Sequence, residues 1–132
     1  IGISNVNLEQ IKAARDIVEI ASVQNRYSIT NREKQDTLDY CSDNGIAFLP
    51  YGSLDAHPLK QGAPLANAEG MIGDIAGKYG VKPNQIALSW LLHRYPNVIL
   101  IPGTTTIGHL EENIQVGEIQ LTDDEIVALN EI

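Results

Sequence analysis

The stretch VILIPGTTTIGHLEEN, residues 98–113, joins a short β-branched run, a Pro-Gly turn, a threonine cluster and the start of a helical pattern. A strand that leads into a helix N-terminus brings free backbone N–H groups and the positive end of the helix dipole to one point. Gly103 allows close approach of the backbone, and Thr104, Thr105 and Thr106 add hydroxyl donors. The stretch is typical of an anion site, although an ordinary turn into a capped helix has the same composition.

The same order of a short apolar run followed by a helical pattern occurs three more times upstream. The runs are residues 1–4, 20–24 and 46–50, and residues 98–101 form the fourth. A further helix precedes the fourth run, and another follows the last repeat. Strands that alternate with helices in this way predict parallel strands with right-handed helical crossovers.

Local signals mark where the helices begin and end. Capping-box spacings occur at three places, where a side chain that can cap a helix is followed three residues later by Glu or Gln. Gly45 and Gly80 are expected to stop helices, a helix weakened by glycine is expected over residues 65–79, and Pro83 suits the first turn of the next helix. The three boxes are Asn7 with Gln10, Thr30 with Glu33, and Thr122 with Glu125.

Length, composition and charge limit the kinds of protein and of partner that fit this sequence. The chain has 132 residues, of which 43% are hydrophobic and 20% charged, as expected for one globular unit with a buried core. Its net charge of -8 argues against nucleic acid or an anionic membrane as partner. The lone Cys41 excludes an internal disulfide, and no apolar run approaches the roughly 20 residues of a membrane span. We therefore expect a cytoplasmic protein.

Two architectures fit this pattern: a flavodoxin-like open sheet, or part of a (β/α)8 barrel. Polar residues follow each run, and ligands bind at the carboxyl ends of parallel strands in both folds. A phosphate site after the last strand favours the barrel. Because a complete barrel needs roughly 250 residues, residues 1–132 are predicted to form a single unit, the (βα)4 half of a TIM barrel.

Four segments resemble the aldo-keto reductases in order and spacing. They are GISN (residues 2–5), SVQNRYSI (22–29), LPYGSL (49–54) and IPGTTTIGHLEEN (101–113). The resemblance spans essentially the whole chain and places it at strands five to eight, the C-terminal half of the family's barrel. It implies an oxidoreductase that uses NADP(H) to reduce carbonyls to alcohols.

The resemblance also implies a nicotinamide end of a cofactor site. Ser4, Asn5 and Gln24 resemble the residues that hydrogen-bond the nicotinamide carboxamide. Tyr51 is similar to the aromatic residue on which the ring stacks. The loop that runs under the pyrophosphate is matched by Gly52, Ser53 and Leu54.

The opening stretch then corresponds to the adenosine end of the same cofactor. Gly103, Thr104, Thr105 and Thr106 match the loop that receives the 2′-phosphate, and Glu112 and Asn113 match the pair that binds adenine. Gly103 and His109 stand where many members have Lys and Arg. Since a neutral His is no substitute for a guanidinium fork, NADP(H) is expected but NAD(H) remains an alternative.

The family's catalytic Asp, Tyr, Lys and His lie on strands two to four, which have no counterpart here. None of His57, His93 (expected at a buried helix end) and His109 has the neighbouring Lys and Tyr that would tune a proton donor. The histidines are also too scattered for a metal site. We therefore predict no catalytic residue and no metal ligand in this chain, and Tyr27, Cys41 and Trp90 are expected to be packing residues.

Two hypotheses for the chain remain open. Ile1 is not a Met and lies inside an expected strand, so the first hypothesis is a fragment whose partner is a missing N-terminal half-barrel. The second is a free-standing, non-catalytic binding or structural module. Such a module would expose strand edges at residues 1–4 and 98–101, so it would self-associate as a homodimer.

Overall fold

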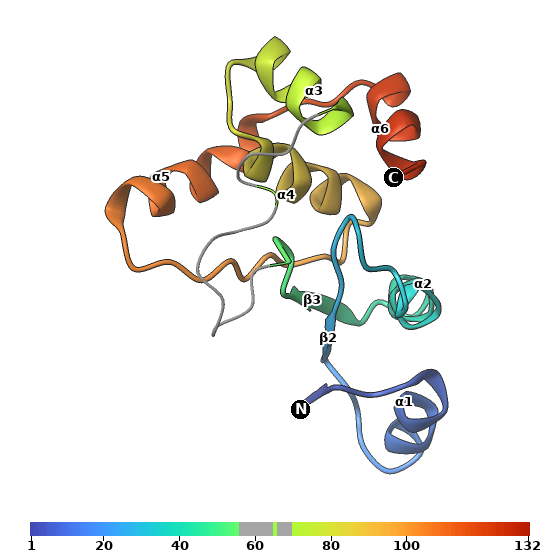
Figure 1. Cartoon of the computed structure of the whole chain (residues 1–132). Helices are drawn as coiled ribbons and strands as arrows, with labels where there is room; N and C mark the ends of the chain where they lie inside the picture. The colour runs from blue at the N-terminus through green and yellow to red at the C-terminus, as the bar shows by residue number, and fades with distance from the viewer. Residues whose placement is uncertain (56–64, 66–69) are drawn as a thin grey trace.

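Three parallel strands form the sheet of the computed structural model, which describes residues 1–55, 65 and 70–132 (Figure 1). The strands β1 (Gly2–Ser4), β2 (Ser22–Arg26) and β3 (Ala47–Tyr51) lie in the order β1-β2-β3. Both neighbouring pairs are parallel, as predicted. The carboxyl ends of the strands therefore meet at one edge of the sheet.

The fourth expected strand, residues 98–101, is reduced to a single bridge. Val98 pairs in parallel with Phe48, whose N–H donates to the Asn97 carbonyl (2.9 Å) and whose carbonyl accepts from Ile99 N–H (2.9 Å). Within the described ranges, no other strand pairs with this segment. A β-branched run has a high strand propensity, but it needs neighbours to form a ladder.

Six α-helices and one 3-10 turn connect and cover the sheet in the described parts of the chain. In Figure 1, α3, α4 and α6 gather at one end of the molecule, and α1 lies at the other end with the N-terminus. The elements are α1 (Leu8–Arg15), α2 (Gln35–Asp43), α3 (Met71–Tyr79), α4 (Pro83–Arg94), α5 (Ile107–Gln115), η1 (Val116–Glu118) and α6 (Asp123–Asn130).

Most of the predicted helix boundaries are confirmed. Asn7 Oδ1 accepts from Gln10 N–H and Gln10 Oε1 accepts from Asn7 N–H, each at 2.9 Å, so the first capping box is complete. The box between Thr122 and Glu125 is also complete. Pro83 is the first residue of α4, and α3 ends at a left-handed glycine. These signals are local, which explains why they are legible in the sequence.

Two other helix predictions are wrong. The box expected at Thr30 does not form, because the Thr30 hydroxyl donates instead to the carboxylate of Asp55, and α2 begins at Gln35. The helix expected over residues 65–79 begins only at Met71 and follows Gly70, whose φ of 77° is not helical. Part of that expected helix, residues 66–69, lies outside the described residues.

The core lies between the sheet and the helices and centres on Trp90 of α4. Its indole stacks on Tyr27, with ring centroids 6.3 Å apart and planes 3° apart, and Tyr27 meets Phe48 edge-on at 6.1 Å. All three side chains are fully buried. The guanidinium groups of Arg32 and Arg94 lie 4.6 and 5.2 Å from the indole centroid, which is cation–π range. The predicted packing roles of Tyr27 and Trp90 are confirmed.

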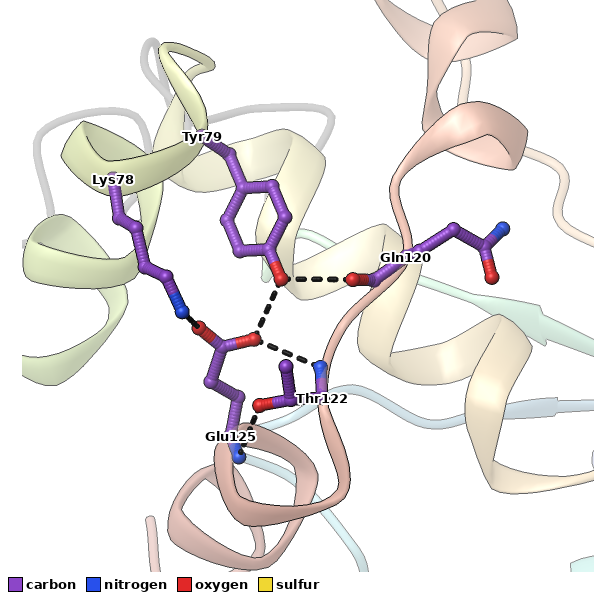
Figure 2. Close-up of polar contacts among 5 residues, drawn as sticks. All are labelled: Lys78, Tyr79, Gln120, Thr122 and Glu125. Carbon is purple, nitrogen blue, oxygen red and sulfur yellow. Dashed lines mark hydrogen bonds and ion pairs between the residues drawn. The ribbon is translucent and has the colours of Figure 1, made fainter.

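A polar cluster ties α3 to α6 around the buried Glu125 (Figure 2). The carboxylate accepts from Lys78 Nζ, from the Tyr79 hydroxyl (2.7 Å) and from Thr122 N–H (2.8 Å). The Tyr79 hydroxyl also lies 2.8 Å from the Gln120 carbonyl. Burial raises the pKa of Glu125, but hydrogen bonds from Lys78, Thr122 and Tyr79 outweigh it and lower that pKa to about 2.

Across the residues that the structure describes, every helix is too short or too polar to cross a membrane.

Candidate functional site

Four of the predicted site residues meet where the strands end. Ser4 Oγ and Asn5 N–H both donate to the Gln24 carbonyl at 3.0 Å. The Tyr51 hydroxyl donates to Asn5 Oδ1 at 2.6 Å. Asn5 has a φ of 56°, a left-handed conformation that Asn tolerates better than most residues. Hydrogen bonds therefore link the end of β1 to β2, and Asn5, the residue after β1, to both β2 and β3 at this edge.

The alternation along β2 decides on which face of the sheet each side chain lies. Val23 and Asn25 are fully buried on the helix side, so Gln24 and Arg26 project onto the opposite face. Arg26 lies opposite Tyr51 in the register of β2 and β3. No hydrogen bond within the described ranges uses the Gln24 side-chain amide, which leaves that amide able to donate and accept toward a ligand.

Asn25 positions the turn that carries Asn5, a role that was not predicted. Its Oδ1 accepts from Val6 N–H (3.0 Å), and its Nδ2 donates to the Val6 carbonyl (2.9 Å) and to Thr37 Oγ1 (3.2 Å). A buried amide with these bonds satisfied is costly to disturb. The sequence marks Asn25 only as a polar residue at a strand end, because the partners of its amide lie in other elements.

The predicted pyrophosphate loop is a tight turn after β3. Gly52 has a φ of 63°, which favours glycine, and its carbonyl accepts from Asp55 N–H at 2.9 Å. Ser53 is 4% exposed, whereas Gly52 and Leu54 are partly exposed. A ligand at this turn would therefore meet Gly52 and Leu54 before Ser53. His57, three residues further along the chain, lies outside the described residues.

The predicted phosphate loop is exposed and loosely bonded. Gly103, Thr104, Thr105 and Thr106 are all exposed. Thr104 Oγ1 accepts from Thr106 N–H at 3.2 Å, and the Thr106 side chain makes no capping bond to α5. No hydrogen bond between described residues joins this loop to the group around Gln24.

The adenine pair of the prediction lies on α5. Glu112 and Asn113 are partly buried, and His109 is exposed. Lys82 Nζ forms an ion pair with Glu112 Oε1, while Gln85 Nε2 donates to the Glu112 carbonyl at 3.0 Å. The side chain of Glu112 is thus already oriented from α4.

Other titratable side chains fall outside this site. The expectation that His93 is buried is wrong, because His93 is exposed. His93 lies on the last turn of α4, and other residues form the buried face of that helix. Cys41 is fully buried, and burial raises the pKa of its thiol to about 11, which confirms a packing role. Among the described residues, no cluster of His, Cys, Asp or Glu could hold a metal ion.

Comparison with known proteins places this geometry in one family. The model of the aldo/keto reductase family matches residues 1–132. Pyridoxine 4-dehydrogenase of Escherichia coli K12 is 39% identical over 132 residues, which are all of this chain and 44% of that protein.

Solved structures agree. Aldose reductase from Giardia lamblia superposes on this chain with a TM-score of 0.88 at 25% sequence identity. The superposition covers 100% of this chain and 44% of the Giardia chain. An aldo-keto reductase of Bombyx mori in complex with NADP superposes with a TM-score of 0.82 at 28% sequence identity. That superposition covers 99% of this chain and 43% of the Bombyx chain. The chain thus spans less than half the length of these relatives, and the predicted fold, part of a (β/α)8 barrel, is confirmed. The chain belongs to the aldo/keto reductase family.

Proposed function

We propose that residues 1–132 are the C-terminal, cofactor-binding half of a barrel that reduces carbonyls to alcohols with NADP(H). In this proposal Ser4, Asn5 and Gln24 hold the nicotinamide carboxamide, and Tyr51 stacks on the ring. The chain contributes no catalytic residue, because the family's Asp, Tyr, Lys and His have no counterpart in it. The chain alone is therefore expected to bind cofactor without reducing a carbonyl.

The observation that carries the proposal is the bonded junction of Tyr51, Asn5 and Gln24. The hydroxyl of Tyr51 is tied to Asn5 at 2.6 Å, which restrains the ring at a strand end. Gln24 keeps its amide toward the same open face, where a carboxamide would find both a donor and an acceptor. A rigid aromatic face beside an amide to which no described residue bonds is chemically suited to a nicotinamide.

The adenosine end of the proposed site rests on the loop of residues 103–106 and on α5. The threonines expose hydroxyl and backbone donors in front of a helix N-terminus, which suits a phosphate. Glu112, oriented by Lys82, and Asn113 offer polar groups one to two turns further along α5. Gly103 and His109 replace the lysine and arginine that would bind the 2′-phosphate, so NADP(H) is expected to bind only slightly better than NAD(H).

The proposed partner is the other half of the barrel. Ile107, Leu110 and Ile114 lie on one face of α5 and are 77%, 49% and 70% exposed. Ile99 in the last extended segment is 52% exposed, and Ile1 beside the edge strand is 72% exposed. Apolar surface at both ends of a partial barrel is suited to a second half-barrel, either the N-terminal half of the fold or a second copy in a homodimer.

Tyr51→Ala is the variant that tests the cofactor site. Removing the ring takes away the stacking surface, so we expect the Kd for NADPH to rise about tenfold. Titration of NADPH fluorescence with the chain measures this, because the nicotinamide emission changes when the ring leaves water.

Tyr51→Phe is the matched control, since it keeps the ring and loses only the hydroxyl bond to Asn5. We expect its Kd for NADPH to rise by less than that of Tyr51→Ala, because the stacking surface stays and only the restraint on the ring is lost. If the wild-type chain leaves the NADPH emission unchanged at millimolar protein, the proposed function is wrong. Equal affinities of wild type and Tyr51→Ala would remove Tyr51 from the site.

A further inference from the structure

We infer that Arg26 binds an oxygen of the cofactor's diphosphate, a role that none of the sequence motifs assigns to it. This inference rests on the proposed function and adds a cationic ligand to the same site. Arg26 is the last residue of β2, two positions beyond Gln24 and therefore on the same face of the sheet. It lies opposite Tyr51, the proposed stacking residue.

The side chain of Arg26 runs alongside the proposed pyrophosphate turn. A Cβ built on Gly52 would lie 3.5 Å from Arg26 Cγ and 3.6 Å from Nε. The stem therefore packs against the backbone of Gly52, and the guanidinium group lies beside the turn that follows Tyr51. A dinucleotide whose nicotinamide stacks on Tyr51 would carry its diphosphate past this turn.

The guanidinium is only partly engaged by the protein. Arg26 Nη2 lies 3.8 Å from Asp55 Oδ1, the long end of the range for an ion pair, and half of the Arg26 side chain is exposed. Within the described parts of the chain, no hydrogen bond uses the Arg26 guanidinium. Its planar fork of donors is the geometry that binds phosphate oxygens.

Asp55 is held in place by other donors, so it does not need Arg26. Ser28 Oγ donates to Asp55 Oδ1 at 2.8 Å, and the Thr30 hydroxyl donates to Oδ2. Asp55 has a φ of 54°, a conformation that Asn also tolerates. Its carboxylate therefore acts as a fixed local charge that restrains Arg26 and competes with an incoming phosphate.

The remaining cations near the core have other partners. Arg32 donates to the carbonyls of Leu129 and Asn130 at the end of α6, at 3.0 and 2.7 Å. Arg94 donates to Asn130 Oδ1 and to Gln35 Oε1, each at 3.0 Å. Among the described residues, Arg26 is thus the arginine that the strand register places at the candidate site.

The test compares three reduced ligands on the wild-type chain and on Arg26→Met, which keeps an apolar stem over Gly52 and loses the charge. NADPH carries the diphosphate, reduced nicotinamide mononucleotide carries one of its phosphates, and reduced nicotinamide riboside carries none. We expect Arg26→Met to raise the Kd about tenfold for NADPH and for the mononucleotide. The Kd of the riboside should stay unchanged. Thermal melting by circular dichroism confirms that both proteins are folded.

Asp55→Asn gives the opposite expectation. It removes the competing charge while keeping an acceptor for Ser28, so the affinity for NADPH should rise about threefold. Arg26→Lys keeps a positive charge but loses the planar fork of donors. Its Kd for NADPH should therefore lie between those of wild type and Arg26→Met.

Three results would overturn the role of Arg26. The first is an equal Kd for NADPH in wild type and Arg26→Met. The second is an equal loss of affinity for all three ligands in Arg26→Met. The third is weaker NADPH binding in Asp55→Asn than in wild type. A wild-type chain that binds no NADPH overturns the proposed function itself, and the role of Arg26 falls with it. The two failures are therefore distinguishable.

Discussion

Trp90→Ala is expected to destabilise the chain by about 3–5 kcal/mol, the range observed when a buried aromatic residue is truncated. Trp90 is fully buried, stacks on Tyr27, and lies within cation–π distance of Arg32 and Arg94. Its Nε1 also donates to Asn130 Oδ1 at 2.9 Å, which ties α4 to the end of α6. One substitution therefore removes packing, stacking and a hydrogen bond together.

Urea denaturation followed by circular dichroism measures this effect, since Trp90 is the only tryptophan and its removal abolishes the fluorescence signal. Because single domains are stable by about 5–15 kcal/mol, the variant is expected to be largely unfolded or to melt well below the wild type. Trp90→Phe keeps an aromatic ring against Tyr27. It should therefore lower the free energy of unfolding by less than half as much as Trp90→Ala. A cost below about 1 kcal/mol for Trp90→Ala would contradict this description of the core.

Glu125→Ala is expected to cost about 1–2 kcal/mol, because it removes the acceptor that three donors share at the contact of α3 with α6. Those donors are Lys78 Nζ, the Tyr79 hydroxyl and Thr122 N–H. The loss also opens the capping box at the start of α6. Val127→Ala is the matched control, since Val127 is 62% exposed on the same helix and should change the free energy of unfolding little.

The same carboxylate makes stability depend on acid pH. The pKa of Glu125 falls from 4.5 to about 2 in the folded chain, so its contribution is complete above pH 4.5. That contribution is lost as the pH falls from 4.5 toward 2, because the unfolded chain binds the proton first. Glu125→Gln should therefore show a shallower loss of stability over this window than the wild type. Identical pH profiles would show that Glu125 does not carry the effect.

The elements that the sequence predicts well are those specified by neighbours in the chain. The boxes at Asn7 and Thr122 need only side chains three residues apart, and both form. The box at Thr30 has the same pattern and fails, because Asp55, which is 25 residues away, takes the Thr30 hydroxyl. Such a tertiary competitor has no local signature.

The extent of the fourth strand also depended on more than its own residues. Its β-branched run has the right propensity, yet only Val98 pairs with β3. Strand length is set by the neighbouring strands as well as by the run itself. The parallel order of the other three strands was predictable, because alternating strands and helices leave few other topologies.

The candidate site was half predictable for a similar reason. The rule that parallel strands present ligands at their carboxyl ends brought Ser4, Gln24 and Tyr51 to one edge, and the structure joins them through Asn5. The alternation of side chains along β2 also places Arg26 on the same face as Gln24. The position of Asp55 could not be predicted in this way. Asp55 itself has a left-handed backbone conformation in the turn after β3, which is uncommon for a residue other than glycine.

The most direct test of the cofactor site is an amide chemical-shift titration of the chain with NADPH. We expect saturable shifts at the amides of Ser4, Asn5 and Tyr51, together with shifts in residues 103–106. The amides around Glu125 should stay in place, because that cluster joins α3 to α6 and includes none of the proposed site residues. No shift at millimolar NADPH, or shifts confined to the α3–α6 contact, would contradict the assignment of this chain as a cofactor-binding half-barrel.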